Sequence, residues 1–131
     1  MTPRAGFHSV TPRIFVSDVG SQAIFLRQTF DAEGDVTHDV PAELCIGDSL
    51  IMVSEASARE AFPAFLDVYV GDADSTYARA LDAGAISLEE PLDQPYGDRR
   101  AMVRDPFWQR LSDRSSADAA DAVGRRRVIP R

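Results

Sequence analysis

The chain has 131 residues, a formal net charge of −7 at pH 7 and a hydrophobic fraction of 44%, enough for one globular domain with its own core. The acidic balance argues against nucleic acid as the main partner, and no apolar run is long enough to span a bilayer, which argues against a membrane partner. A single cysteine, Cys45, excludes an intrachain disulfide, and the N-terminus lacks an apolar secretory segment. The sequence therefore predicts a cytoplasmic protein.

The first half of the chain predicts a strand, a helix and three short strands. Residues 10–16 have strand composition, and Pro12 places them at a sheet edge or a bulge. Asp18 stands where a helix N-cap is expected, and Gly34 is expected to end the helix region. Between them, four apolar residues follow the spacing of one helix face: Val19, Ala23, Leu26 and Phe30. The three strands are expected over residues 36–40, 43–46 and 49–54.

The second half repeats this order. Residues 65–70 form a second alternating strand, Asp72 follows it as Asp18 follows the first, and Gly84 closes the second helix. The apolar spacing of the first helix recurs in Ala73, Tyr77 and Ala80. Further strands are expected over residues 86–89, 100–104 and 110–113. The chain thus predicts two copies of strand–helix–strand–strand–strand.

One segment near the end of the second copy resembles a known signature. In YGDRRAMVRDPFWQRLSD, residues 96–113, the Asp105-Pro106 turn separates two strands. GDRR-x-x-VRDPF resembles the C-terminal signature of the vicinal-oxygen-chelate superfamily, which includes glyoxalase I, the bleomycin-resistance proteins and the extradiol dioxygenases. The resemblance covers roughly residues 10–114. It implies an α+β fold in which two βαβββ modules form a curved sheet around a cavity, commonly in a homodimer.

The resemblance also implies a domain organisation. Residues 1–114 are expected to form a single glyoxalase-like domain, with modules at about 8–56 and 62–114. Residues 115–131, rich in Ser, Ala, Asp and Arg, are expected to be a flexible C-terminal tail.

Metal-dependent members of the superfamily place ligands on the first and last strand of each module. By this resemblance, the four positions fall at Thr11, Met52, Phe65 and Ser112. A hydroxyl, a thioether and a phenyl ring are poor donors for a divalent ion. We therefore expect no metal and no other cofactor. The alternative is a metal-dependent lyase, isomerase or dioxygenase whose ligands lie at shifted positions.

The remaining cavity lining is apolar and aromatic. The candidate ligand-binding residues are Thr11, Met52, Phe65, Tyr69, Arg100, Met102, Trp108 and Ser112, with Phe107 beside them. Trp108 stands where the resembled signature has glycine after DPF, which puts the local turn in question. The functional hypothesis is a metal-free protein that binds a small aromatic or antibiotic-like molecule, as in drug sequestration.

Several residues have more than one interpretation. Arg99, Arg100 and Arg104 form either an anion-binding rim or structural ion pairs, with Arg104 fixing the turn through Asp105. His8 and His38 lack a second histidine at ligand spacing and are interpreted as surface residues. Cys45 lies in an apolar strand, which predicts a buried and unreactive thiol.

Overall fold

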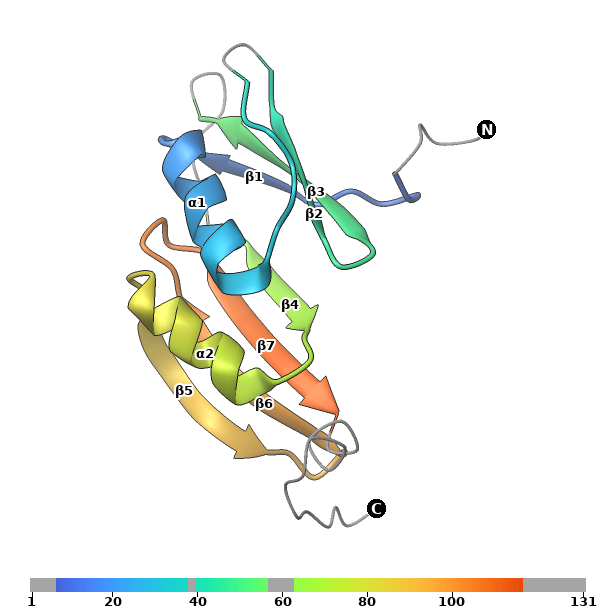
Figure 1. The fold of residues 1–131 in the computed structure, drawn as a ribbon, viewed down its shortest axis with the longest axis vertical. Helices are drawn as coiled ribbons and strands as arrows, with labels where there is room; N and C mark the ends of the chain where they lie inside the picture. The colour runs from blue at the N-terminus through green and yellow to red at the C-terminus, as the bar shows by residue number, and fades with distance from the viewer. Residues whose placement is uncertain (1–6, 38–39, 57–62, 117–131) are drawn as a thin grey trace. The chain divides into compact units, whose positions relative to one another are not determined.

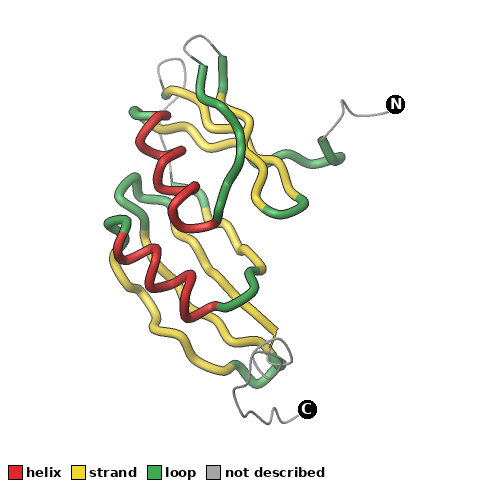
Figure 2. The backbone as a smooth tube through the Cα atoms, viewed as in Figure 1, coloured by secondary structure: helices red, strands yellow, loops and turns green. Residues whose placement is uncertain are grey.

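The structure, a computed structural model, describes residues 7–37, 40–56 and 63–116. The chain divides into two compact units, Met1–Pro63 and Ala64–Arg131. Each unit consists of one helix and one sheet (Figure 1), and Figure 2 shows the same division by secondary structure. The predicted α+β class is therefore confirmed.

The first unit has a three-stranded sheet with the strand order β1-β3-β2. Its elements are β1 (Arg13–Val16), α1 (Val19–Phe30), β2 (Ala42–Ile46) and β3 (Ser49–Glu55). β1 runs parallel to β3, and β2 is antiparallel to β3. α1 packs against β2 and β3, and the buried core between them contains Ile14, Leu26, Leu44, Ile51 and Val53.

The start of α1 agrees with the sequence-based prediction, but its end does not. Asp18 is the N-cap, and its Oδ1 accepts the Ser21 N–H at 3.0 Å. The helix ends at Phe30, where Asp31 takes a left-handed conformation with φ 56° and donates its N–H to the last turn. Gly34 lies beyond this end with φ 140°, where a Cβ would clash with the backbone carbonyl of Glu43. Gly34 therefore permits a close approach to β2 and does not cap the helix.

Other first-unit predictions also need correction. β1 begins at Arg13, after Pro12, because proline has no N–H to donate to the sheet. Val36 and Thr37 lie outside any strand, and His38 falls outside the described residues. Cys45 is exposed, because its side chain points away from the face that α1 covers.

The second unit follows the predicted order of one strand, one helix and three strands. Its elements are β4 (Phe65–Tyr69), α2 (Ala73–Asp82), β5 (Ile86–Asp93), β6 (Asp98–Arg104) and β7 (Arg110–Ser116). The four-stranded sheet has the order β4-β7-β6-β5. β4 runs parallel to β7, and the other neighbours are antiparallel.

α2 covers one face of this sheet, above β5, β6 and β7 (Figure 1). Small residues on the helix, Ala73 and Ala80, are buried with Ala101, Val103 and Leu111 of the strands. β7 continues to Ser116 and so includes the first two residues of the predicted tail, and the rest of the tail lies outside the described residues. No helix among the described residues is long and apolar enough to cross a membrane.

Candidate functional site

One face of the four-stranded sheet is turned away from α2. The Ala73 N–H donates to Ser115 Oγ at 3.1 Å, and Arg99 pairs with Asp74 of α2 at 2.9 Å, so the odd-numbered residues of β6 and β7 face the helix. Because side chains alternate along a strand, the even-numbered residues of β6 and β7 face the other way. We call this second surface the Tyr69 face, defined by Phe65, Tyr69, Arg100, Met102, Ser112 and Arg114.

Exposed aromatic rings are the most prominent feature of the Tyr69 face. Phe65 is 56% exposed and Tyr69 is 67% exposed, although both belong to β4. They lie four residues apart on one strand, which corresponds to a separation of about 13 Å. The strand therefore holds two aromatic rings on the same side of the sheet.

Arg114 of β7 makes most of the polar contacts on this face. Arg114 makes a bidentate ion pair with Asp67, with N···O distances of 2.6 and 3.0 Å, and a longer contact of 3.3 Å with Asp98. Its guanidinium lies 5.7 Å from the ring centre of Tyr69 and 5.9 Å from that of Tyr96. Burial is the largest single influence and lowers the pKa of Arg114, but the hydrogen bonds to Asp67 and Asp98 and the negative charge of Asp67, together with Tyr96, outweigh it and raise the pKa. Arg114 thus carries a permanent charge and positions Tyr69.

A hydrogen bond to Asp98 fixes the hydroxyl of Tyr69. It donates a hydrogen bond of 2.6 Å to Asp98 Oδ2. This bond raises the pKa of Tyr69 above that of a free phenol. Tyr69 is therefore a neutral phenol at neutral pH, suited to stacking and hydrogen bonding rather than to proton abstraction.

Arg100 and Ser112 offer polar atoms on the same face. Ser112 is 1% exposed, and neither its Oγ nor Arg100 Nε has a hydrogen-bond partner within the described chain. Another atom of Arg100, Nη2, pairs with Glu89 at 2.8 Å. The two residues lie in adjacent rows of the sheet, since Met102 pairs with Ser112 and Arg100 pairs with Arg114. Buried donors without partners are costly, so these two atoms lower the stability of this part of the sheet.

Trp108 lies in the turn between β6 and β7, at the position where the resembled signature has glycine. Its φ is 73°, so tryptophan adopts the left-handed conformation that the signature glycine would take. Its ring is 61% exposed, with the Arg104 guanidinium 4.2 Å from the ring centre. Asp105 holds the turn by accepting the N–H groups of Phe107 and Gln109, each at 2.9 Å. The turn after DPF therefore keeps the backbone conformation expected for glycine, and the Trp108 backbone is strained as a result.

The three arginines proposed as one rim do not share a face. Arg99 points toward α2 and pairs with Asp74 of that helix at 2.9 Å and with Asp93 of β5 at 3.1 Å. Arg100 lies on the Tyr69 face, and Arg104 points to the same side of β6. The single-rim interpretation is therefore wrong, because neighbouring strand positions point in opposite directions.

The residues at the resembled metal positions do not form a donor set. In the first sheet Met52 pairs with Arg13, and Thr11 lies two residues before the strand. In the second sheet Ser112 pairs with Asp67, while Phe65 pairs with Arg110. A thioether, a phenyl ring and two hydroxyls do not suit a divalent ion. Across residues 7–37, 40–56 and 63–116, no group of three or more His, Cys, Asp or Glu side chains could hold a metal.

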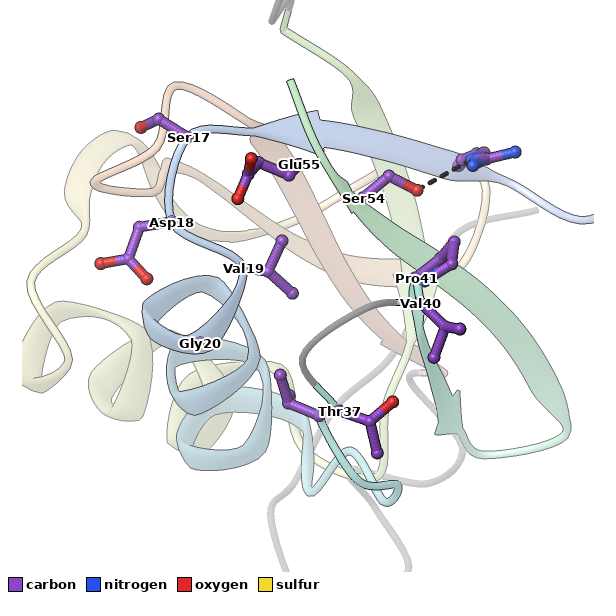
Figure 3. A pocket seen from close by; sticks show the side chains of 11 residues that line it. Ser17, Asp18, Val19, Gly20, Thr37, Val40, Pro41, Ser54 and Glu55 are labelled. Carbon is purple, nitrogen blue, oxygen red and sulfur yellow. Dashed lines mark hydrogen bonds between the residues drawn. The ribbon is translucent and has the colours of Figure 1, made fainter. Parts of the chain in front are cut away.

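The first unit contains a separate pocket of about 670 Å³. It lies where β1 and β3 end, beside the start of α1 and the segments before β2 (Figure 3). Its lining includes Asp18 and Glu55, the hydroxyls of Ser17 and Thr37, and apolar side chains. Its volume lies within the usual range for small-molecule sites.

Comparisons with known proteins place the chain among mycobacterial relatives. It is 30% identical to the uncharacterized protein Mb0911c of Mycobacterium bovis over 127 residues, which covers 79% of this chain and 80% of the relative. The uncharacterized protein Rv0887c of Mycobacterium tuberculosis is also 30% identical, over 79% of this chain and 72% of its own length. The chain belongs to the family of these proteins. No protein-family profile matches it.

Solved structures identify the fold. TioX from Micromonospora sp. ML1 superposes with a TM-score of 0.68 at 20% identity, over 82% of this chain and 99% of TioX. A glyoxalase/bleomycin resistance protein/dioxygenase family enzyme from Burkholderia phytofirmans gives a TM-score of 0.69 at 19% identity, over 79% and 94% of the two chains. The protein has the vicinal-oxygen-chelate fold. The fold predicted from the GDRR-x-x-VRDPF signature is thereby confirmed.

The structure also reveals residues that sequence reasoning missed. Five of the predicted site residues lie on the Tyr69 face: Phe65, Tyr69, Arg100, Met102 and Ser112. Asp67, Asp98 and Arg114 join them through ion pairs and were not predicted. Asp67 was detectable, because it lies between Phe65 and Tyr69 in the period-two pattern of the strand.

Proposed function

We propose that the protein binds a small, flat organic molecule on the Tyr69 face without a metal ion. The observation that carries this proposal is the pair of exposed rings, Phe65 and Tyr69, held on one strand beside a fixed guanidinium. Aromatic rings bury a large area and stack on planar groups with offset geometry. A rigid strand reduces the entropy lost on binding.

The polar groups of the Tyr69 face suggest how such a ligand is oriented. Arg100 presents its guanidinium on this face, where Nη2 pairs with Glu89 at 2.8 Å, and a guanidinium suits an oxygen acceptor on the ligand. Arg104 presents its guanidinium beside the exposed Trp108 ring at the end of β6. Stacking supplies affinity, and the donors supply orientation.

The biological role we propose is sequestration of an antibiotic-like molecule by a cytoplasmic homodimer. Sequestration needs no covalent step. The ionisable groups Tyr69, Asp98 and Arg114 are engaged with one another, which supports a binding function over proton transfer.

Isothermal titration calorimetry with 1-naphthoate and with bleomycin tests this proposal. We expect Tyr69→Ser and Trp108→Ala each to weaken binding about tenfold, because each removes a stacking surface. Tyr69→Phe keeps the ring and is expected to bind nearly as the native protein does. Leu81→Ser, which changes an exposed apolar residue of α2, is the control.

Circular dichroism and thermal melting establish that each variant folds. Unchanged affinity in Tyr69→Ser, with a native melting profile, would remove the Tyr69 face from the site. If the native protein bound neither 1-naphthoate nor bleomycin, the proposed ligand class would be wrong.

A further inference from the structure

The described lining of the pocket in the first unit shares no residue with the Tyr69 face. Its described lining comes from Arg13 of β1, from residues 17–20 after β1, from residues 36–37 and 40–41 before β2, and from the end of β3. Its volume is about 670 Å³, and all its lining residues belong to one compact unit. A ligand there would contact parts of the chain that are distant in sequence.

Two carboxylates define the charge of this pocket. Asp18 accepts hydrogen bonds from the Ser21 N–H at 3.0 Å and the Ser21 hydroxyl at 2.8 Å, and these lower its pKa. Asp18 is therefore ionised at neutral pH and fixed in direction. Glu55 is exposed at the end of β3. Figure 3 shows Asp18 and Glu55 toward one side of the pocket.

Among the other described lining residues, Arg13 alone carries a charge. Arg13 donates to Ser54 Oγ at 2.9 Å and lies 5.2 Å from the ring centre of Phe15, so protein groups position its guanidinium. The apolar part of the wall consists of Val19, Val36, Val40 and Pro41. Figure 3 shows Val40 and Pro41 away from the two carboxylates. The pocket thus combines an anionic region with an apolar region.

We propose that this pocket binds a small organic cation, an ammonium group carrying an apolar body. The ammonium pairs with Asp18 and Glu55, and the body packs against the valine and proline side chains. The formal net charge of −7 draws cations toward the protein and repels anions. The residues of this site differ from those proposed to bind flat molecules.

The test uses three probes with the same six-carbon chain: hexylammonium, 1-hexanol and hexanoate. Calorimetry or ligand-observed NMR measures their affinities for the full chain at low salt. We expect hexylammonium to bind at least tenfold more tightly than 1-hexanol, and hexanoate to bind most weakly. Added salt should weaken hexylammonium binding, because it screens the carboxylates.

Two variants test whether hexylammonium binds in the pocket of the first unit. Glu55→Gln removes one charge, and Asp18→Asn removes the other while keeping a side chain that caps α1 well. Each is expected to weaken hexylammonium binding about fivefold and to leave 1-naphthoate binding unchanged. Glu90→Gln, an exposed change on β5 of the other unit, is the matched control.

Two results would overturn the proposal. One is equal affinity for hexylammonium and 1-hexanol. The other is unchanged hexylammonium affinity in the folded Glu55→Gln and Asp18→Asn variants. Neither result bears on the Tyr69 face, whose test uses different probes and different variants.

Discussion

At the scale of single residues, Trp108 holds a backbone conformation that tryptophan seldom adopts. Its φ of 73° lies in the left-handed region, where a Cβ approaches the neighbouring carbonyl. The Asp105 carboxylate holds the turn around it through two backbone N–H groups. An exposed ring on a strained turn is consistent with a role in binding rather than in packing.

This strain can be measured by comparing Trp108→Gly with Trp108→Ala. Both variants lose the ring and its contact with Arg104, but only glycine relieves the backbone. We expect the free energy of unfolding of Trp108→Gly to exceed that of Trp108→Ala by about 1 kcal/mol. Urea denaturation followed by circular dichroism measures the difference, and equal stabilities would show that the turn is not strained.

Asp113 is a buried carboxyl under α2. It is 3% exposed, and its Oδ2 has no hydrogen-bond partner in the described chain. Burial raises the pKa of Asp113 to about 7, with a further increase from Asp74 and an opposing effect from Arg79. In the folded state the carboxyl therefore keeps its proton at mildly acidic pH.

The raised pKa of Asp113 gives stability a predictable pH dependence. Because the folded state holds the proton more tightly than the unfolded state, this stabilisation is present below pH 4 and is lost as pH rises toward 7. Asp113→Asn replaces the carboxyl by an amide that does not ionise, so the loss of stability above pH 7 should disappear. We expect the free energy of unfolding at pH 8 to rise by on the order of 2 kcal/mol, after allowance for solvent screening.

Urea denaturation at pH 5 and pH 8 tests this expectation. Asp82→Asn, an exposed change at the end of α2, controls for the loss of one negative charge. A gain in Asp113→Asn that is the same at both pH values would mean that the carboxyl does not titrate in this range.

At the scale of elements, both helices begin in the same way. Asp18 and Asp72 have extended backbones, and each accepts an N–H group from the first turn of its helix. In α2 the donor is Asp74, at 3.0 Å from Asp72 Oδ1. The repeated strand–aspartate–helix order is therefore a repeated capping arrangement.

Replacing the cap of α2 should destabilise the protein modestly. Asp72→Ala removes the acceptor for the Asp74 N–H and is expected to lower the free energy of unfolding by about 1 kcal/mol. Asp72→Asn keeps an acceptor oxygen and should remain close to the native protein. Thermal or urea denaturation of the pair measures the cap, and equal losses in both variants would indicate a role for charge instead.

At the scale of the whole molecule, the fold alone does not specify a chemistry. The donor groups at the four resembled metal positions are poorly suited to a divalent ion. Native mass spectrometry after soaking in zinc, nickel, iron and manganese salts is expected to show a homodimer without a bound metal. One divalent ion per chain would contradict the metal-free proposal and direct attention to the lyase, isomerase and dioxygenase reactions.

The sequence by itself determined the features that depend on nearby residues. The caps at Asp18 and Asp72, the turn at Asp105 and most strands were predictable, because capping, turn chemistry and side-chain alternation operate over a few residues. The error at Gly34 arose because a close approach to the Glu43 carbonyl of β2 decided the backbone there.

Only the tertiary structure decided which side chains meet. The parallel pairing of β4 with β7 sets Asp67 beside Ser112 and Tyr69 beside Arg114, across more than 40 residues of chain. A shift of one residue in that register would turn these side chains to the other face. The Tyr69 face and the pocket of the first unit both depend on such long-range pairing, because strand register is set by packing across the whole sheet and not by local sequence.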